Sequence, residues 1–379
     1  MSQSLDIVVI GLAISSSWGN GHATTYRSLL KGMQRRGHRI TFLERDQPWY
    51  AQHRDAPALG YCSMQLYADA TDLRERFAEL IRHADAIIVG SYVAEGRSII
   101  HWMLEEATGV RAFYDIDTPV TLADLANDSC GYLAREQIPQ LDLLLSFTGG
   151  PTLSRLESTY GARLAVPLYC SVDAERYRDL HVARDIDLGY MGTYSKDRQP
   201  GLERLLNETA RRLPHRAFSV VGAQYPQELS WPANVCRLDH LGPDEHPYFY
   251  SRQRFTLNLT RADMRAAGYS PSVRLFEAAA CGTPIISDRW PGLTELFAEA
   301  EEILTAEHAS EVVAYLREVS NAQARRLAAA ARARVLASHT GDRRAEELEF
   351  WITHVATRSA FSKRPGASSV ELRMPAAAG

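Results

Sequence analysis

Short apolar runs recur along the chain, and stretches with helical periodicity separate them. In the first half, "ATTYRSLLKGMQRR", "DLRERFAELIRH" and "GRSIIHWMLEEA" carry apolar residues at helical spacing. Strands that alternate with helices are typical of parallel sheets with both faces covered. The apolar runs of this half predict strands at residues 5–14, 39–45, 85–90, 111–117, 141–147 and 162–169.

A second series of apolar runs begins near residue 186. It predicts strands at residues 186–192, 217–223, 235–241, 254–260 and 283–288. Two such series in 379 residues predict an α/β protein with two Rossmann-like domains, whose parallel sheets face a central cleft. We expect an N-terminal domain over 1–170 and a C-terminal domain over 171–340. A helix over 341–358 would pack back toward the first domain, and 359–379, which has no period, would be a disordered tail.

Composition excludes several classes of protein. Hydrophobic residues make up 45% of the chain and charged residues 23%, with a net charge of −4, and no basic block supports a nucleic-acid partner. The apolar N-terminal run "LDIVVIGLAI" lacks a basic region before it and continues into a loop, so it predicts a first strand rather than a signal peptide. No run reaches transmembrane length. Five scattered cysteines without metal-ligand spacing indicate reduced thiols and a cytoplasmic location.

The segment "SPSVRLFEAAACGTPIISD" at residues 270–288 places a glutamate in an apolar helix. We expect Ser270 as the N-cap, Pro271 as the first helical residue and Gly282 as the left-handed stop. Glu277 then lies among apolar neighbours, where a carboxylate is costly unless something pairs with it. Two partners are possible: Arg274, one turn earlier, or a ligand.

The longer segment "PSVRLFEAAACGTPIISDRWPGLTEL" resembles the donor-nucleotide segment of GT-B glycosyltransferases, especially the CgeB-like (spore maturation protein type) branch. The resemblance implies that the helix start faces a sugar-nucleotide diphosphate and that Glu277 binds the ribose hydroxyls. "YMGTYSKDRQPGLERLL" is similar to the strand, loop and helix of that family, with Arg198 six positions after Gly192. Helix N-termini and arginine both suit an anion, which agrees with this role. The donor residues implied are Gly192, Thr193, Arg198, Gly222, Ser270, Ser272, Arg274 and Glu277.

The resemblance further implies a glycosyltransferase that needs no cofactor or metal beyond a nucleotide-diphosphate sugar of the UDP, GDP or dTDP type. The acceptor is not identified by the sequence. Many retaining relatives carry a second glutamate eight positions before the first, and here that position is Tyr269. Its absence leaves retention of configuration without support.

"GNGHATTYRSLLKGMQRRGH" is similar to the "GH…GH" pattern of inverting, UGT-like GT-B enzymes, in which the first histidine is the general base. That histidine is His22 here, and His38 is expected to be structural. A histidine titrates near neutrality and suits a base that deprotonates an acceptor hydroxyl. "YDIDTP" offers Asp115 and Asp117 at a neighbouring strand end to orient or replace it. These residues favour inversion.

Other interpretations stay open at this point. His22 and Asp117 also fit cap or turn positions, and Arg198 fits an ordinary helix surface. The basic run "QARRLAAAARARVLASH" is most simply a solvated helix face, although it could touch an anionic partner. A GT-B nucleotide-sugar 2-epimerase and a non-catalytic nucleotide-binding protein are alternatives. A phosphorylase needs a pyridoxal-binding lysine that no context here provides, and a dehydrogenase needs a G-x-G-x-x-G turn that the first strand lacks.

Overall fold

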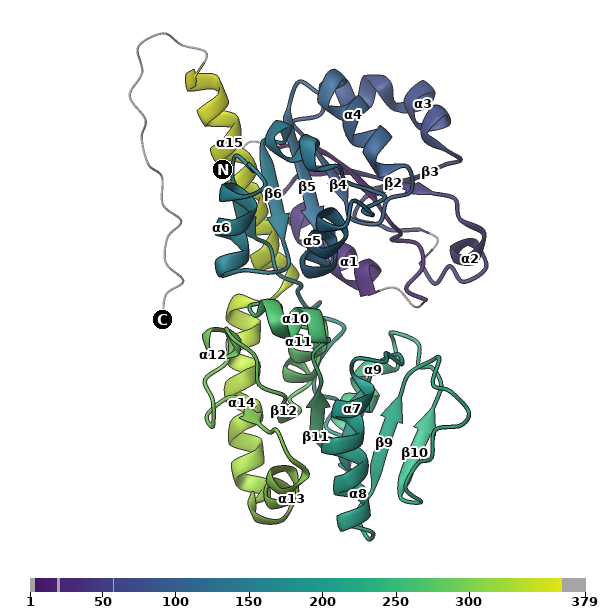
Figure 1. Ribbon diagram of the computed structural model, residues 1–379, viewed down its shortest axis with the longest axis vertical. Coiled ribbons are helices and arrows are strands. Elements are labelled where there is room, and N and C mark those ends of the chain that lie inside the picture. Colours follow the sequence, from purple (N-terminus) through teal and green to yellow (C-terminus); the bar gives the residue numbers. More distant parts are fainter. Residues whose placement is uncertain (1–3, 19–20, 57, 363–379) are drawn as a thin grey trace. The chain divides into compact units, whose positions relative to one another are not determined.

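The computed structural model describes residues 4–18, 21–56 and 58–362, with side chains up to residue 358. The chain divides into two compact units. Unit 1 comprises Met1–Cys170 and Gly341–Gly379, and unit 2 comprises Ser171–Thr340. Each unit is built on one parallel sheet with helices against it (Figure 1). The prediction of two Rossmann-like α/β domains is therefore confirmed.

The sheet of unit 1 has the strand order β3-β2-β1-β4-β5-β6-β7, and all of its pairings are parallel. Its strands are β1 (Asp6–Gly11), β2 (Arg39–Arg45), β3 (Ser63–Tyr67), β4 (Ala86–Gly90), β5 (Val110–Asp115), β6 (Leu143–Ser146) and β7 (Ala165–Pro167). Its helices are α1 (Gly21–Arg35), α2 (Pro48–Ala51), α3 (Ala70–His83), α4 (Gly96–Glu106), α5 (Thr118–Ala126), the 3₁₀ helix η1 (Arg135–Gln140), α6 (Pro151–Ser158) and α15 (Gly341–Ser362). β3 was not expected, because only one of its five residues is fully buried and the apolar run is weak.

The last helix, α15, packs against α1 within unit 1. Two glycines allow a close approach: a Cβ on Gly341 would lie 2.2 Å from the Ser28 carbonyl oxygen, and one on Gly32 would lie 2.5 Å from the Gly341 carbonyl oxygen. The buried His38 lies 3.2 Å from Glu349 on α15 and accepts a hydrogen bond from the Leu5 amide, which agrees with its expected structural role. The helix continues to Ser362, so the first residues of the expected tail are helical. Residues 363–379 lie outside the described part of the chain.

The sheet of unit 2 has the order β10-β9-β8-β11-β12-β13, again all parallel. Its strands are β8 (Ile186–Met191), β9 (Phe218–Val221), β10 (Val235–Leu238), β11 (Gln253–Asn258), β12 (Ile285–Ser287) and β13 (Leu304–Thr305). Its helices are α7 (Gln199–Leu202), the π-helical turn η2 (Glu203–Asn207), α8 (Glu208–Arg212), α9 (His246–Ser251), α10 (Ala262–Ala267), α11 (Val273–Ala280), α12 (Leu293–Leu296), α13 (Ala309–Glu318) and α14 (Asn321–Ser338).

The start of α11 differs from the prediction. The helix begins at Val273, and its N-cap is Ser272 rather than Ser270. The expected cap is displaced because Tyr269 adopts a left-handed conformation (φ 49°) and the buried Ser270 hydroxyl contacts the Met264 sulfur instead. Gly282 has φ 67°, as expected of the residue that ends the helix.

No helix in the described part of the chain is both long enough and apolar enough to cross a membrane.

Candidate active site

Both sheets reverse their strand order at one point, and open parallel sheets bind ligands beyond the carboxyl ends of the strands at such points. In unit 1 the reversal lies between β1 and β4, and in unit 2 between β8 and β11. The loop that leads to His22 follows β1, whereas Gly192 follows β8 directly. The topology therefore places these two predicted residues at the expected edge of their own sheets.

Arg274 joins the strand ends at the reversal point of unit 2. Its guanidinium donates to the Met191 carbonyl oxygen at the end of β8 (2.9 Å) and to the Leu259 carbonyl oxygen just after β11 (2.8 Å). It also donates to the Tyr190 hydroxyl and, through Nε, to Ser272 Oγ. These four bonds take up most of its donors. Arg274 therefore shapes the site, and it does not form an ion pair with Glu277.

At the same edge, two glycines allow the backbone at the ends of β8 and β9 to approach closely. A Cβ on Gly192 would lie 2.8 Å from an Arg274 guanidinium nitrogen. Gly222 has φ 158°, and a Cβ there would lie 1.9 Å from the Gly192 carbonyl oxygen. The ends of β8 and β9 can approach each other in this way only without side chains at these positions.

Arg198 lies beside this edge, and not all of its guanidinium N–H groups are hydrogen-bonded within the described residues. One of its terminal nitrogens donates to the Thr193 carbonyl oxygen (2.8 Å), while its buried Nε has no hydrogen-bond partner among the described residues. Burial and the nearby Arg274 guanidinium lower the pKa of Arg198. Two guanidinium groups this close repel each other, so an anion beside them would be stabilising.

Glu277 is 3% exposed in the middle of α11. Its carboxylate accepts a hydrogen bond from the Tyr250 hydroxyl (3.3 Å), and no ion pair joins it within the described residues. Burial and the adjacent Glu277 carboxylate raise the pKa of both Tyr250 and Tyr177 well above the usual value, which places two neutral phenols around the carboxylate. Of the two partners considered for Glu277, Arg274 is eliminated.

The remaining residues that were predicted to bind the sugar-nucleotide donor make different contacts. Thr193 holds Arg198 through its carbonyl oxygen. Ser272 uses its hydroxyl to accept from Arg274 and does not cap α11 with it. Ser270 is buried. Tyr269, which stands where retaining relatives carry glutamate, packs against Gly292 and donates its amide to the Pro291 carbonyl oxygen.

Sequence reasoning missed Asp288, which directly follows the strand β12 and is 6% exposed. Its carboxylate accepts from the amide and the hydroxyl of Thr260 (3.1 and 2.9 Å). Burial raises its pKa. Together with Arg198 and Thr260, Asp288 lines a small cavity of about 60 Å³ at the carboxyl edge. Its position as the last residue of the predicted strand "TPIISD" was the available signal.

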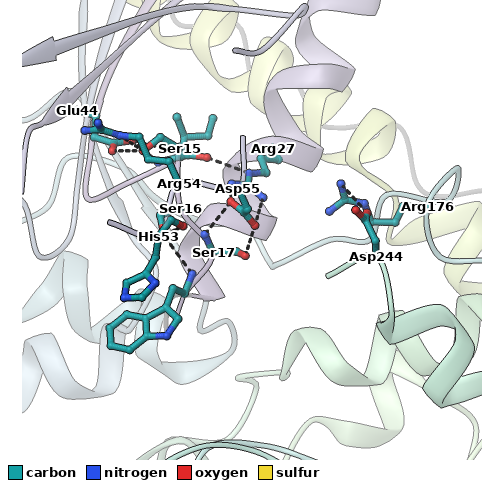
Figure 2. A network of polar contacts seen from close by, with 12 residues as sticks. Ser15, Ser16, Ser17, Arg27, Glu44, His53, Arg54, Asp55, Arg176 and Asp244 are labelled. Carbon is teal, nitrogen blue, oxygen red and sulfur yellow. Dashed lines mark hydrogen bonds and ion pairs between the residues drawn. The ribbon is translucent and has the colours of Figure 1, made fainter. Parts of the chain in front are cut away.

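The loop after β1 in unit 1 is held by two carboxylates, the buried Glu44 and the exposed Asp55. The fully buried Glu44 on β2 accepts from the amides of Ile14 and Ser15 (2.6 and 2.9 Å) and from the Ser15 hydroxyl. Asp55 accepts from Arg27 and Ser17. Figure 2 shows both anchors on the two sides of the loop. This network holds the loop at Ile14, Ser15 and Ser17 and links it to Arg27 on α1.

His22, the second residue of α1, stacks edge-on against Tyr92, with ring centroids 5.5 Å apart. Tyr92 follows β4 in a left-handed conformation (φ 63°), which is uncommon for a bulky residue. Its hydroxyl donates to Asp117 (2.8 Å). Tyr92 thus contacts both His22 and Asp117.

The electrostatics of His22 correct one premise of the sequence reasoning. Desolvation by burial lowers its pKa to about 4, whereas the sequence argument assumed a value near neutrality. The imidazole is therefore neutral at pH 7, which leaves a nitrogen able to accept a proton but makes it a weak base in this state.

Asp115 is the last residue of β5 and is 2% exposed. Its carboxylate accepts from the Thr121 hydroxyl (2.8 Å) and from the amide of Asp117 (3.2 Å). Burial raises its pKa to about 7. Its contacts fix the backbone of Asp117 at the start of α5, so its observed role is to position its neighbour.

Within the described residues, no group of three or more His, Cys, Asp or Glu side chains is arranged to hold a metal ion.

Residues 198–349 match the family model described as glycosyl transferase-like. The match includes Arg198, Gly222 and all of α11. No curated protein matches the chain in sequence.

Solved structures share the fold along nearly the whole chain. Sucrose-phosphate synthase from Thermosynechococcus elongatus aligns with a TM-score of 0.65 at 14% identity, covering 95% of this chain and 100% of its own. An α-glucosyltransferase in complex with UDP and a DNA 13-mer aligns with a TM-score of 0.72 at 14% identity, covering 93% and 100%. HepE from Anabaena in complex with UDP-glucose gives 0.62 at 12% identity, covering 94% and 99%. The fold is thus that of GT-B glycosyltransferases.

Proposed function

We propose that the protein transfers a sugar from a nucleotide-diphosphate donor to an acceptor hydroxyl. The observation that carries this proposal is Glu277, a buried carboxylate that no cation neutralises among the described residues and that neutral phenols surround. A carboxylate in this setting suits the vicinal hydroxyls of a ribose, which supply two donors. The glycosyl transferase-like match over this segment supports the same role.

The diphosphate of the donor would bind at the carboxyl edge of β8 and β11. Arg198 supplies unpaired donors there, and the start of α11 supplies backbone amides and a favourable dipole. Arg274, Gly192 and Gly222 keep this edge in shape. In this proposal the negative charge of the leaving diphosphate is stabilised by these groups without an obligatory metal. UDP is the first nucleotide to test, because solved structures with the same fold contain UDP or UDP-glucose.

For the chemical step we propose a single displacement. The acceptor hydroxyl loses its proton to His22, its oxygen forms a bond to the anomeric carbon, and the bond from that carbon to the diphosphate breaks with its electron pair on the leaving group. Asp117 and Tyr92 form a polar pair beside His22, and Asp115 positions Asp117. The five free thiols fit a cytoplasmic location, which belongs to this proposal.

Three measurements on the purified protein test the proposal. Calorimetric titration with UDP, GDP, dTDP and NAD should show binding of one nucleoside diphosphate and none of NAD; preference for NAD would contradict a transferase. With the donor known, an acceptor screen by mass spectrometry detects transfer. The configuration of the product, determined by NMR, should be inverted. Epimerised donor in the absence of an acceptor would instead indicate a nucleotide-sugar 2-epimerase.

A further inference from the structure

A second feature of unit 2 lies at the amino edge of its sheet, opposite the edge that carries Arg198 and Glu277. A hollow of about 1150 Å³ opens there, beside the first residues of β8 and β11 and against one face of α14. Strands of up to six residues separate the two edges by roughly 20 Å. The hollow is therefore separate from the candidate donor site.

Arginine dominates the lining of this hollow. In the described part of the chain, six arginines line it: Arg184, Arg216, Arg254, Arg317, Arg325 and Arg332. The carboxylates that line it are Asp179 and Asp187, and both are engaged: Asp187 accepts from Arg216 (2.9 Å), and Asp179 lies 3.5 Å from His181. The lining therefore carries an excess of positive charge in a molecule whose net charge is −4.

Three of these arginines are fixed by the backbone. Arg184 donates to the carbonyl oxygens of Gln253 and Gly282 (2.9 and 2.7 Å), and Arg332 donates to that of Ala280 (3.1 Å). Arg254 donates to the Leu316 carbonyl oxygen. The remaining N–H groups of these arginines keep a defined orientation, which lowers the entropic cost of binding an anion.

Arg317 at the end of α13 and Arg325 on α14 are exposed. Neither has a hydrogen bond or an ion pair to any residue in the described ranges. Desolvation, opposed by Asp179 and reinforced by Arg325, lowers the pKa of Arg184. The guanidinium groups thus repel one another, and an anion between them would relieve that repulsion.

Alanines on α14 account for the open space in the hollow. The face of α14 that lines it carries Ala324, Ala328, Ala329 and Ala333 beside Arg325 and Arg332. Small side chains leave room between the flanking arginines for a ligand. The volume lies just above the range of about 300–1,000 Å³ that is usual for small-molecule sites, so a small molecule with several anionic groups fits.

From this geometry we propose that the hollow is a second ligand site, which binds a small molecule with two or more phosphate groups. Guanidinium groups recognise phosphate oxygens through paired, charge-assisted hydrogen bonds. Several arginines around one hollow favour a ligand that carries several negative charges. The phosphates belong to a free oligophosphate or to the phosphate chain of a nucleotide. The site does not depend on the proposed sugar transfer.

Calorimetric titration of the full chain with tripolyphosphate tests this proposal. The double variant Arg317→Ala, Arg325→Ala removes two unpaired guanidinium groups and breaks no hydrogen bond or ion pair among the described residues. We expect it to weaken binding at least about tenfold. Arg326→Ala is the matched control, because this exposed neighbour on α14 does not line the hollow; it should leave the affinity unchanged. Arg198→Ala, at the opposite edge, should retain the binding.

The outcomes are separable. Equal tripolyphosphate affinity in the wild type and the double variant overturns the proposal, as does an equal loss in Arg326→Ala, which would indicate general surface attraction. Further titrations with ATP and with vesicles of anionic phospholipid distinguish the sources of phosphate. Binding to vesicles but not to tripolyphosphate or ATP would contradict a small-molecule site and indicate a membrane surface.

Discussion

Replacing Asp115 by asparagine should change how the stability of unit 1 depends on pH. Burial raises the pKa of this carboxyl from 3.8 to about 7. The native protein therefore binds a proton that the unfolded chain releases, and the free energy of unfolding falls as pH rises from about 4 to 7. The difference of roughly three pKa units corresponds to about 4 kcal/mol at pH 8, as an upper estimate. Asparagine cannot ionise and keeps an oxygen for the Thr121 hydroxyl.

The assay is urea unfolding between pH 5 and 8, followed by tryptophan fluorescence. We expect Asp115→Asn to gain stability relative to wild type as pH rises, by about 2–4 kcal/mol across this range. Asp124→Asn, a partly exposed position on α5, the helix that follows Asp115, is the matched control. Parallel stability curves for wild type and Asp115→Asn would refute the reasoning, because they would mean that the buried carboxyl titrates as it does in the unfolded chain.

Three further predictions concern catalysis and packing. His22→Ala should lower kcat about 10²–10⁴-fold and leave nucleotide affinity unchanged. Because burial lowers the pKa of His22, the acid limb of the kcat/KM profile of the wild type should lie well below pH 6.5. An acid limb at pH 6.5 would contradict the burial of the ring. Gly222→Ala should weaken UDP binding in calorimetry, since its Cβ would collide with the Gly192 carbonyl oxygen. Gly341→Ala should lower the free energy of unfolding by about 1–3 kcal/mol, measured in urea, because it separates α1 from α15; unchanged stability would mean that the helices adjust freely.

The hydrophobic pattern was sufficient to predict most strands, because a strand buried on both faces is apolar throughout. Strand β2 was predicted with the observed ends, and β8 within one residue. The pattern failed for β3 at the sheet edge, where the first four side chains alternate between exposed and intermediate positions and only Tyr67 is buried. It also failed for the two-residue strand β13, which is too short to produce a period.

The site was predictable only in part. Glu277 could be singled out because a charge in an apolar helix is conspicuous in a sequence. Its phenolic neighbours could not, because Tyr177 and Tyr250 lie far from it in the chain and come close only through the fold. The low pKa of His22 could not be predicted either, because desolvation depends on packing that no local sequence pattern encodes. The left-handed Tyr269, which moved the start of α11, has no propensity signal either.

The central claim is that unit 2 binds the nucleotide of a sugar donor through Glu277, and calorimetric titration with UDP tests it most directly. Glu277→Gln keeps the shape of the side chain but removes its charge, so UDP affinity should fall by about 1–3 kcal/mol, roughly 5- to 150-fold. Glu295→Gln, at an exposed position on α12, serves as the control and should bind as the wild type does. Unchanged affinity in a folded Glu277→Gln protein would contradict the account.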